Sequence, residues 1–174
     1  MSPQSDQQNP GLAVGHPLNE GVDWRAFTRY ARDGDPSNPE PWKFFVKTNG
    51  PLDTVWPGSE PVVSTRLRSV LEPLVGHAAQ FLPVTINDDT FWVIKVNLVV
   101  DALDLERTEF FRSDGAIHEF EKPVWIGNRI ESPALFRIPM HEFRHKFFAT
   151  AEVKEAYEAS GCGGMRFWFP GEVI

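Results

Sequence analysis

The pattern of apolar and polar positions divides the chain into a polar beginning and a continuous core-forming body. Residues 1–23 are polar, rich in Pro, Gly, Asn and Gln, and have no core-facing period, which predicts a flexible N-terminal arm. Residues 24–174 have the length of one compact domain and predict a single domain. Near its start, a turn-rich connector at residues 33–41 precedes a short aromatic run at residues 42–47 that favours a strand.

Two segments of the body have the apolar spacing and the end signals of short helices. Ser64 can cap the first and Gly76 can end it, and Thr150 and Gly161 take the same places in the second. The apolar positions at helical spacing are Leu67, Val70, Leu71 and Leu74 in the first helix, and Val153, Ala156 and Tyr157 in the second.

Alternation of apolar and polar residues predicts strands between and after these helices. Residues 81–86 and 91–100 flank four polar residues, which indicates a hairpin. In the second strand the even positions are all apolar and the odd ones include Lys95 and Asn97, so we expect one buried face and one partly exposed face. Shorter strands are predicted at residues 109–112, 117–121, 124–126, 135–138 and 165–169. The predicted fold class is α+β: one domain with a mostly antiparallel twisted sheet and two short helices packed on one face.

Composition and charge narrow the possible functions. The chain has 17 Lys and Arg against 24 Asp and Glu, a net charge of -7, which argues against nucleic acid as a partner. No apolar run approaches the roughly 20 residues of a membrane span, and the first residues do not have the pattern of a signal peptide. The single cysteine, Cys162, cannot form an internal disulfide. These features predict a soluble cytoplasmic protein.

The stretch HEFRH contains His141, Glu142 and His145 in the H-E-x-x-H order of zinc hydrolases. On an α-helix the two histidines share a face and bind the metal, and the glutamate activates water. Pro139 and the capping Thr150 leave room for about two turns at most. Candidates for a third ligand, none at a diagnostic spacing, are His16, His77, His118, Glu152 and Glu155. A solvated connector is the favoured interpretation, and a zinc-dependent hydrolase is the alternative.

Other enzyme signatures are weaker still. Cys162 lies in the run GCGG, where a flexible turn is a sufficient reason for the glycines, and a cysteine nucleophile would need a histidine base from elsewhere. The same run lacks the Lys-Ser or Lys-Thr of a phosphate-binding loop. The sequence therefore predicts neither an enzyme nor a bound cofactor.

The remaining feature is an acidic stretch between residues 101 and 121. Such a surface accelerates encounter with a basic partner and orients it. Nearby aromatic residues could anchor the partner if they are exposed. The candidate partner-binding residues are Asp101, Asp104, Glu106, Glu109, Asp114 and Glu119, and the candidate anchors are Phe110, Phe111 and Trp125.

Several ordered segments resemble immunity protein family 11 of bacterial polymorphic toxin systems. The resemblance runs from about residue 56 to residue 169, and its most specific part is VVDALDLERTEF at residues 99–110. Supporting segments are VWPGSEPVVSTRLRSVLEP, QFLPVTI, FRIP and AEVKEAYEASGCGGMRF. The family pattern does not include a zinc motif at HEFRH or the polar arm before Trp24, and it assigns no contact residues to carry over.

The resemblance implies a cytoplasmic protein with no chemistry of its own, which binds and neutralises a cognate toxin encoded by a neighbouring reading frame. Either the toxin's active site or an adjacent surface could be covered. The competing interpretations are the zinc hydrolase and a sheet-edge interaction module without a toxin partner.

Overall fold

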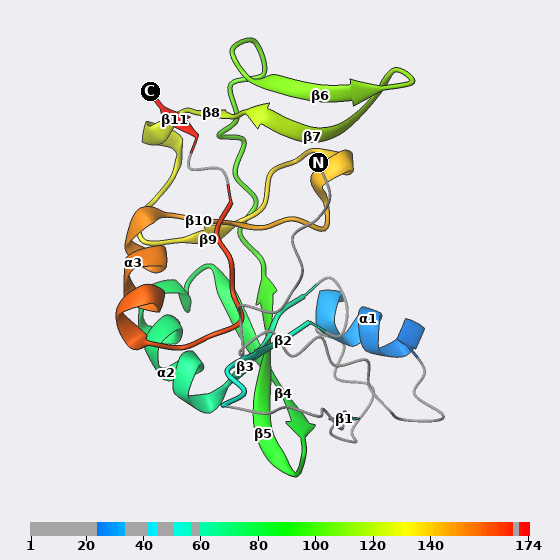
Figure 1. Cartoon of the computed structure of the whole chain (residues 1–174), viewed down its shortest axis with the longest axis vertical. Coiled ribbons are helices and arrows are strands. Elements are labelled where there is room, and N and C mark those ends of the chain that lie inside the picture. The colour runs from blue at the N-terminus through cyan, green and yellow to red at the C-terminus, as the bar shows by residue number, and fades with distance from the viewer. Residues whose placement is uncertain (1–23, 34–41, 45–50, 57–59, 169–170) are drawn as a thin grey trace.

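The computed structural model (Figure 1) describes residues 24–33, 42–44, 51–56, 60–168 and 171–174. The predicted arm at residues 1–23 and most of the predicted connector lie outside the described residues. No helix in the described ranges has both the length and the apolar content to cross a membrane. In chain order the helices and strands are α1 (Trp24–Asp33), β1 (Lys43–Phe44), β2 (Thr54–Val55), β3 (Val62–Ser64), α2 (Thr65–Val75), β4 (Ala79–Ile86), β5 (Asp89–Val96), β6 (Glu109–Ser113), β7 (Ala116–Lys122), β8 (Val124–Trp125), η1 (Gly127–Arg129), β9 (Leu135–Phe136), η2 (His141–Phe143), β10 (Phe148–Ala149), α3 (Ala151–Ser160) and β11 (Glu172–Val173).

A five-stranded sheet forms the centre of the molecule, with strand order β1-β4-β5-β3-β2. All its pairs are antiparallel except β1 with β4, so the predicted α+β class with a mostly antiparallel sheet is confirmed. The predicted hairpin is β4–β5, and its turn places Asn87 and Asp88 at φ 51° and 69°. Asparagine and aspartate tolerate this left-handed conformation, which two-residue hairpin turns require. The second strand ends at Val96, four residues earlier than predicted.

The two predicted helices, α2 and α3, pack together on one face of this sheet. Ser64 caps α2 as expected, because its hydroxyl accepts a hydrogen bond from the Leu67 amide at 3.2 Å. Gly161 ends α3 at φ 66°. Thr150 stands at the N-cap of α3 but makes no capping bond, because its hydroxyl accepts from the Ala134 amide instead. That hydroxyl therefore joins α3 to the segment before β9.

A helix that the sequence analysis did not predict covers the other face of the sheet. Phe27 and Ala31 of α1 are buried against Phe91 and Val93 of β5. The prediction that this face is partly exposed is therefore wrong at the centre of the sheet. The sequence contains a signal for this helix, because Phe27, Tyr30 and Ala31 recur at helical spacing.

Past β5 the strands leave the central sheet and form two-stranded sheets: β6–β7, β8–β11 and β9–β10. A third core cluster beneath them is largely aromatic, and its buried members are Ala102, Leu103, Phe120, Trp125, Phe136, Ile138 and Phe143. The strand predicted at residues 165–169 is absent over residues 165–168, and residue 169 lies outside the described ranges. The reason is that this segment runs beside α3, and none of the described strands pairs with it.

Candidate functional site

The β6–β7 hairpin stands away from the central sheet, at the end of the molecule opposite the β4–β5 turn (Figure 1). Its turn contains Asp114 and Gly115 at φ 51° and 78°, a geometry that favours this residue pair. The inner face packs through Phe110 and Phe120 on Phe143, and the Phe120 and Phe143 ring centroids are 4.0 Å apart. This aromatic support gives an exposed hairpin a fixed position.

The three candidate aromatic anchors differ in exposure. Trp125 is buried in the aromatic cluster, and Phe110 is partly buried under the hairpin. Phe111 is 51% exposed, and its ring lies 6.1 Å from that of His118 on the neighbouring strand. Of the three, Phe111 is therefore the one that another protein can reach.

Three of the six acidic candidates form ion pairs with cations. Asp101 lies 3.7 Å from Arg129, and Glu119 lies 3.5 Å from Lys146. These partners come from outside the acidic stretch. They reduce the negative potential that the stretch by itself would produce.

The third pair joins the two strands of the hairpin at its base. The Lys122 ammonium donates a hydrogen bond to the Glu109 carboxylate at 2.9 Å. This bond and the carboxylate charge raise the pKa of Lys122. Because both side chains are exposed, the pair aligns the strands at little cost and can exchange with a partner's charges.

The other three acidic candidates have different surroundings. Asp104 has a structural role, because its carboxylate accepts from the amides of Glu106 and Arg107 and closes a turn. Glu106 is exposed beyond that turn, and Asp114 is exposed at the tip of the hairpin. Within the described ranges, Glu106 and Asp114 have no ion pair, so they retain the most electrostatic influence on a partner.

The H-E-x-x-H stretch does not adopt the geometry of a zinc helix. His141 to Phe143 form one turn of 3-10 helix, in which residues four apart do not share a face. His141 and His145 are exposed, and the Arg144 guanidinium contacts a ring nitrogen of each. A cation thus occupies the space between the two imidazoles.

No other ligand in the described part of the chain joins these histidines, because no group of three His, Cys, Asp or Glu side chains comes together there. Of the proposed third ligands, Glu152 forms a hydrogen bond with Ser132 that lowers its pKa, and His118 contacts the Ser113 carbonyl. His16 lies outside the described residues. Cys162 is buried in the loop after α3, where its amide donates to Ser160.

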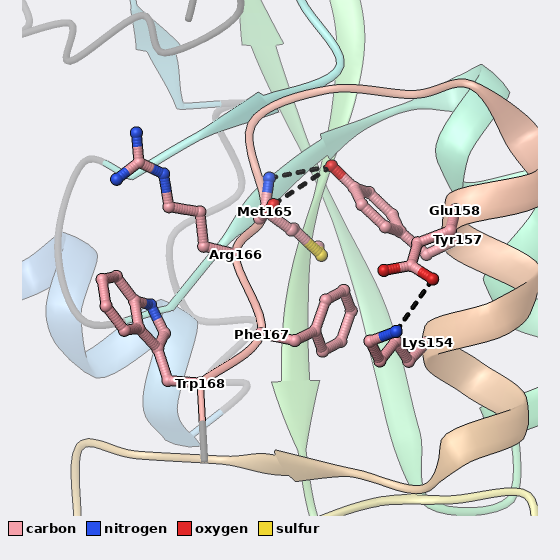
Figure 2. Close-up of a pocket in the computed structure, with 7 residues that line it drawn as sticks. All are labelled: Lys154, Tyr157, Glu158, Met165, Arg166, Phe167 and Trp168. Carbon is pink, nitrogen blue, oxygen red and sulfur yellow. Dashed lines mark hydrogen bonds and ion pairs between the residues drawn. The ribbon is translucent and has the colours of Figure 1, made fainter. Parts of the chain in front are cut away.

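A second exposed surface, which has no recognisable motif in the sequence, lies beside α3. Lys154, Tyr157 and Glu158 of α3 and residues 165–168 line a hollow of about 310 Å³ (Figure 2). Trp168 is 68% exposed at its margin. The signal in the sequence was the alternation of residues 165–168, which was interpreted as a paired strand.

A second hollow, of about 360 Å³, lies where the base of the hairpin meets the C-terminal strand β11. Glu109 and Lys122 line it from the hairpin, and Gly171 and Glu172 line it from the C-terminal segment. Arg107 lies 3.9 Å from Glu172 across this junction. The hairpin and the end of the chain therefore form adjoining surfaces.

Together these features define a small α+β protein. Its most prominent exposed surface is the β6–β7 hairpin, which the aromatic cluster supports. The model of the Immunity protein family (Imm11) matches residues 2–169, and the chain belongs to this family. The match includes the polar arm, so the expectation that the arm lies outside the family pattern is wrong. Among curated proteins, none is similar enough to this chain to count as a match.

Proposed function

We propose that this protein neutralises a cognate toxin of a bacterial polymorphic toxin system by direct protein–protein contact in the cytoplasm. The observation that carries the proposal is the family match over residues 2–169. Membership in an immunity family implies a toxin partner, and neutralisation by contact needs an accessible surface and no reactive group of the protein's own.

The β6–β7 hairpin is the proposed contact surface. Phe111 supplies an exposed aromatic group, and large aromatic side chains contribute much of the binding energy in protein interfaces. Asp114 and Glu106 supply negative charge on the same part of the molecule. A toxin face with basic residues around an apolar depression would complement this arrangement.

The other acidic candidates have secondary parts in the proposal. Asp101, Glu109 and Glu119 can exchange their present cations for those of the toxin, at some cost in affinity. Asp104 maintains the turn that presents Glu106. We therefore expect the largest electrostatic effects at Asp114 and Glu106, and an indirect effect at Asp104.

Co-expression tests the function. The product of the neighbouring reading frame should arrest growth when expressed alone, and this protein should restore growth and purify with it as a complex. A harmless neighbour, or a toxin whose effect persists without any complex, would refute the proposal. A complex that forms without restoring growth would instead favour an interaction module without a protective role.

Charge reversal tests the surface. Phe111→Ala and Asp114→Lys should each weaken toxin binding by about tenfold or more in calorimetry. Asp89→Lys is the matched control, because it makes the same charge change at the β4–β5 turn, at the opposite end of the molecule (Figure 1). Equal affinities for Asp114→Lys and Asp89→Lys would place the contact elsewhere.

Enzyme kinetics on the complex distinguish the two modes of neutralisation. If the immunity protein covers the active site, a small substrate of the toxin should compete with it for binding. If it binds a neighbouring surface, the small substrate should still bind, and inhibition should be confined to the macromolecular substrate.

A further inference from the structure

The segment Met165–Trp168, which we name the strap, follows α3 and has alternating sides. Met165 and Phe167 point toward α3, whereas Arg166 and Trp168 point away from it (Figure 2). The Phe167 ring meets the Tyr157 ring edge-on at 5.4 Å. This period of two is the pattern of a β-strand with one face on the core.

Tyr157 holds the strap in place through its backbone. The phenol oxygen accepts from the Met165 amide at 2.9 Å and donates to the Met165 carbonyl at 3.5 Å (Figure 2). Both backbone groups of Met165 are thereby satisfied without a neighbouring strand.

The start of the strap is fixed as well. The buried carboxylate of Asp53 accepts from the Gly163 amide at 3.1 Å, and the Trp56 indole donates to the Gly164 carbonyl at 3.2 Å. Trp56 in turn stacks on Phe147, with ring centroids 6.0 Å apart. A segment anchored in this way loses little conformational entropy when something binds to it.

Beyond Met165 the strap has unused hydrogen-bonding capacity. In the part of the chain that the structure describes, the backbone amides and carbonyls of Arg166, Phe167 and Trp168 make no hydrogen bond. The Arg166 guanidinium, exposed on the outer side, has no carboxylate within ion-pair distance there. An extended chain laid alongside would pair with the backbone groups of Arg166 and Trp168, which point to the same edge of the strap, because the direction of these groups alternates along an extended chain.

We propose that the strap is the docking edge for an extended strand of the toxin, which pairs with its backbone, places an acidic side chain beside Arg166 and covers Trp168. This inference rests on the proposed function for the identity of the partner. The hollow of about 310 Å³ between the strap and α3 receives an apolar side chain of the added strand. Trp and Arg are the residue types most often found as binding hot spots.

The hairpin is less suited to this kind of pairing. The β6–β7 ladder has register shifts at Glu109/Phe110 and Phe111/Arg112, and bulges and charged side chains are common means of protecting an edge strand from pairing. The hairpin would thus contribute side-chain contacts, and the strap would contribute main-chain contacts. The two can serve one partner, because the strap leads to β11 at the base of the hairpin.

Amide hydrogen exchange tests the inference directly, on wild-type full-length protein with and without the co-purified toxin. The amides of Arg166 and Trp168, which point to the same edge of the extended strap, should exchange quickly in the free protein and become protected at least about tenfold in the complex. Fast exchange at these amides in a fully formed complex overturns the inference and leaves the proposed function intact. Absence of any complex overturns both.

Substitutions give a second, independent measurement. Arg166→Glu and Trp168→Ala should each raise the toxin dissociation constant about tenfold or more. The matched controls are Arg29→Glu, which makes the same charge change on α1 at the opposite face of the central sheet, and Val99→Ala for an exposed apolar group, since Val99 is 57% exposed. Unchanged affinity in both strap variants would overturn the inference. Protection of the strap in the free protein together with a dimer mass in light scattering would identify a second copy of this chain as the occupant, and this too would overturn it.

Discussion

Replacement of Arg137 with methionine should destabilise the protein strongly, because it removes a cation that pairs with the buried carboxylate of Glu60. The Arg137 guanidinium donates to Glu60 at 2.9 Å, and the two side chains are 16% and 5% exposed. A second guanidinium nitrogen donates to the Arg144 carbonyl in the H-E-x-x-H stretch. Methionine retains most of the apolar stem, so the variant mainly removes charge and hydrogen bonds.

The expected loss follows from these contacts. Removing one partner of a buried ion pair costs about 3–5 kcal/mol, because the remaining charge loses the attraction of that partner in a poorly solvated site. The bond to the Arg144 carbonyl adds about 1 kcal/mol. Against a total stability of about 5–15 kcal/mol for a domain, Arg137→Met should remove a large fraction of the folding free energy.

A double-mutant cycle gives the control. Adding Glu60→Leu to Arg137→Met removes the buried carboxylate charge, so the double variant should recover about 2 kcal/mol or more relative to Arg137→Met. Urea unfolding followed by circular dichroism measures all four proteins. A loss of less than about 1 kcal/mol in Arg137→Met would refute this prediction, and so would a double variant whose loss of stability equals the sum of the two single losses.

Further predictions concern the aromatic cluster, the strap and the histidines. Phe143→Ala should lower the free energy of unfolding, measured with urea, by about 3–5 kcal/mol, because this ring is 1% exposed and supports the hairpin. A loss under about 1 kcal/mol would contradict the view that Phe143 supports the aromatic cluster. Tyr157→Phe should cost about 1–2 kcal/mol by removing both bonds to Met165. Burial raises the pKa of Tyr157, so the contribution of this residue to stability should be constant below about pH 10 and fall above it, where the unfolded phenol ionises first. Tyr157→Phe should reduce the loss of stability above about pH 10, and an unchanged dependence of stability on pH would contradict this prediction. His141→Ala and His145→Ala should leave the unfolding midpoint and the zinc content of the purified protein unchanged, and stoichiometric zinc that is lost in these variants would revive the hydrolase hypothesis.

Local signals in the sequence were reliable where neighbouring residues decide the conformation. The hydroxyl of Ser64 and the glycine at position 161 marked helix ends correctly, because capping and left-handed conformations depend on a few adjacent residues. The β4–β5 hairpin was also predictable, since its turn and its apolar alternation agree. The family resemblance likewise came from ordered segments and is confirmed by the match over residues 2–169.

Predictions that depended on distant partners were less accurate. The acidic stretch could be located, but Arg129 and Lys146 reach it from later segments and neutralise part of its charge. The H-E-x-x-H order did not determine a helix, because three residues of 3-10 helix fit between the surrounding strands. The sequence identified Phe111 as a candidate anchor, but it could not show that Phe111 is exposed whereas Trp125 is buried and Phe110 is partly buried.

By itself, the sequence determined the α+β class, the two capped helices, the central hairpin and the immunity family, since period, caps and turns are encoded within short segments. The tertiary structure decided which apolar faces meet, which charges are paired and which backbone groups lack a partner. The strap illustrates the reason: its alternation specifies an extended chain, but a strand also needs a neighbour at hydrogen-bonding distance. Residues far away in the sequence determine whether such a neighbour is present.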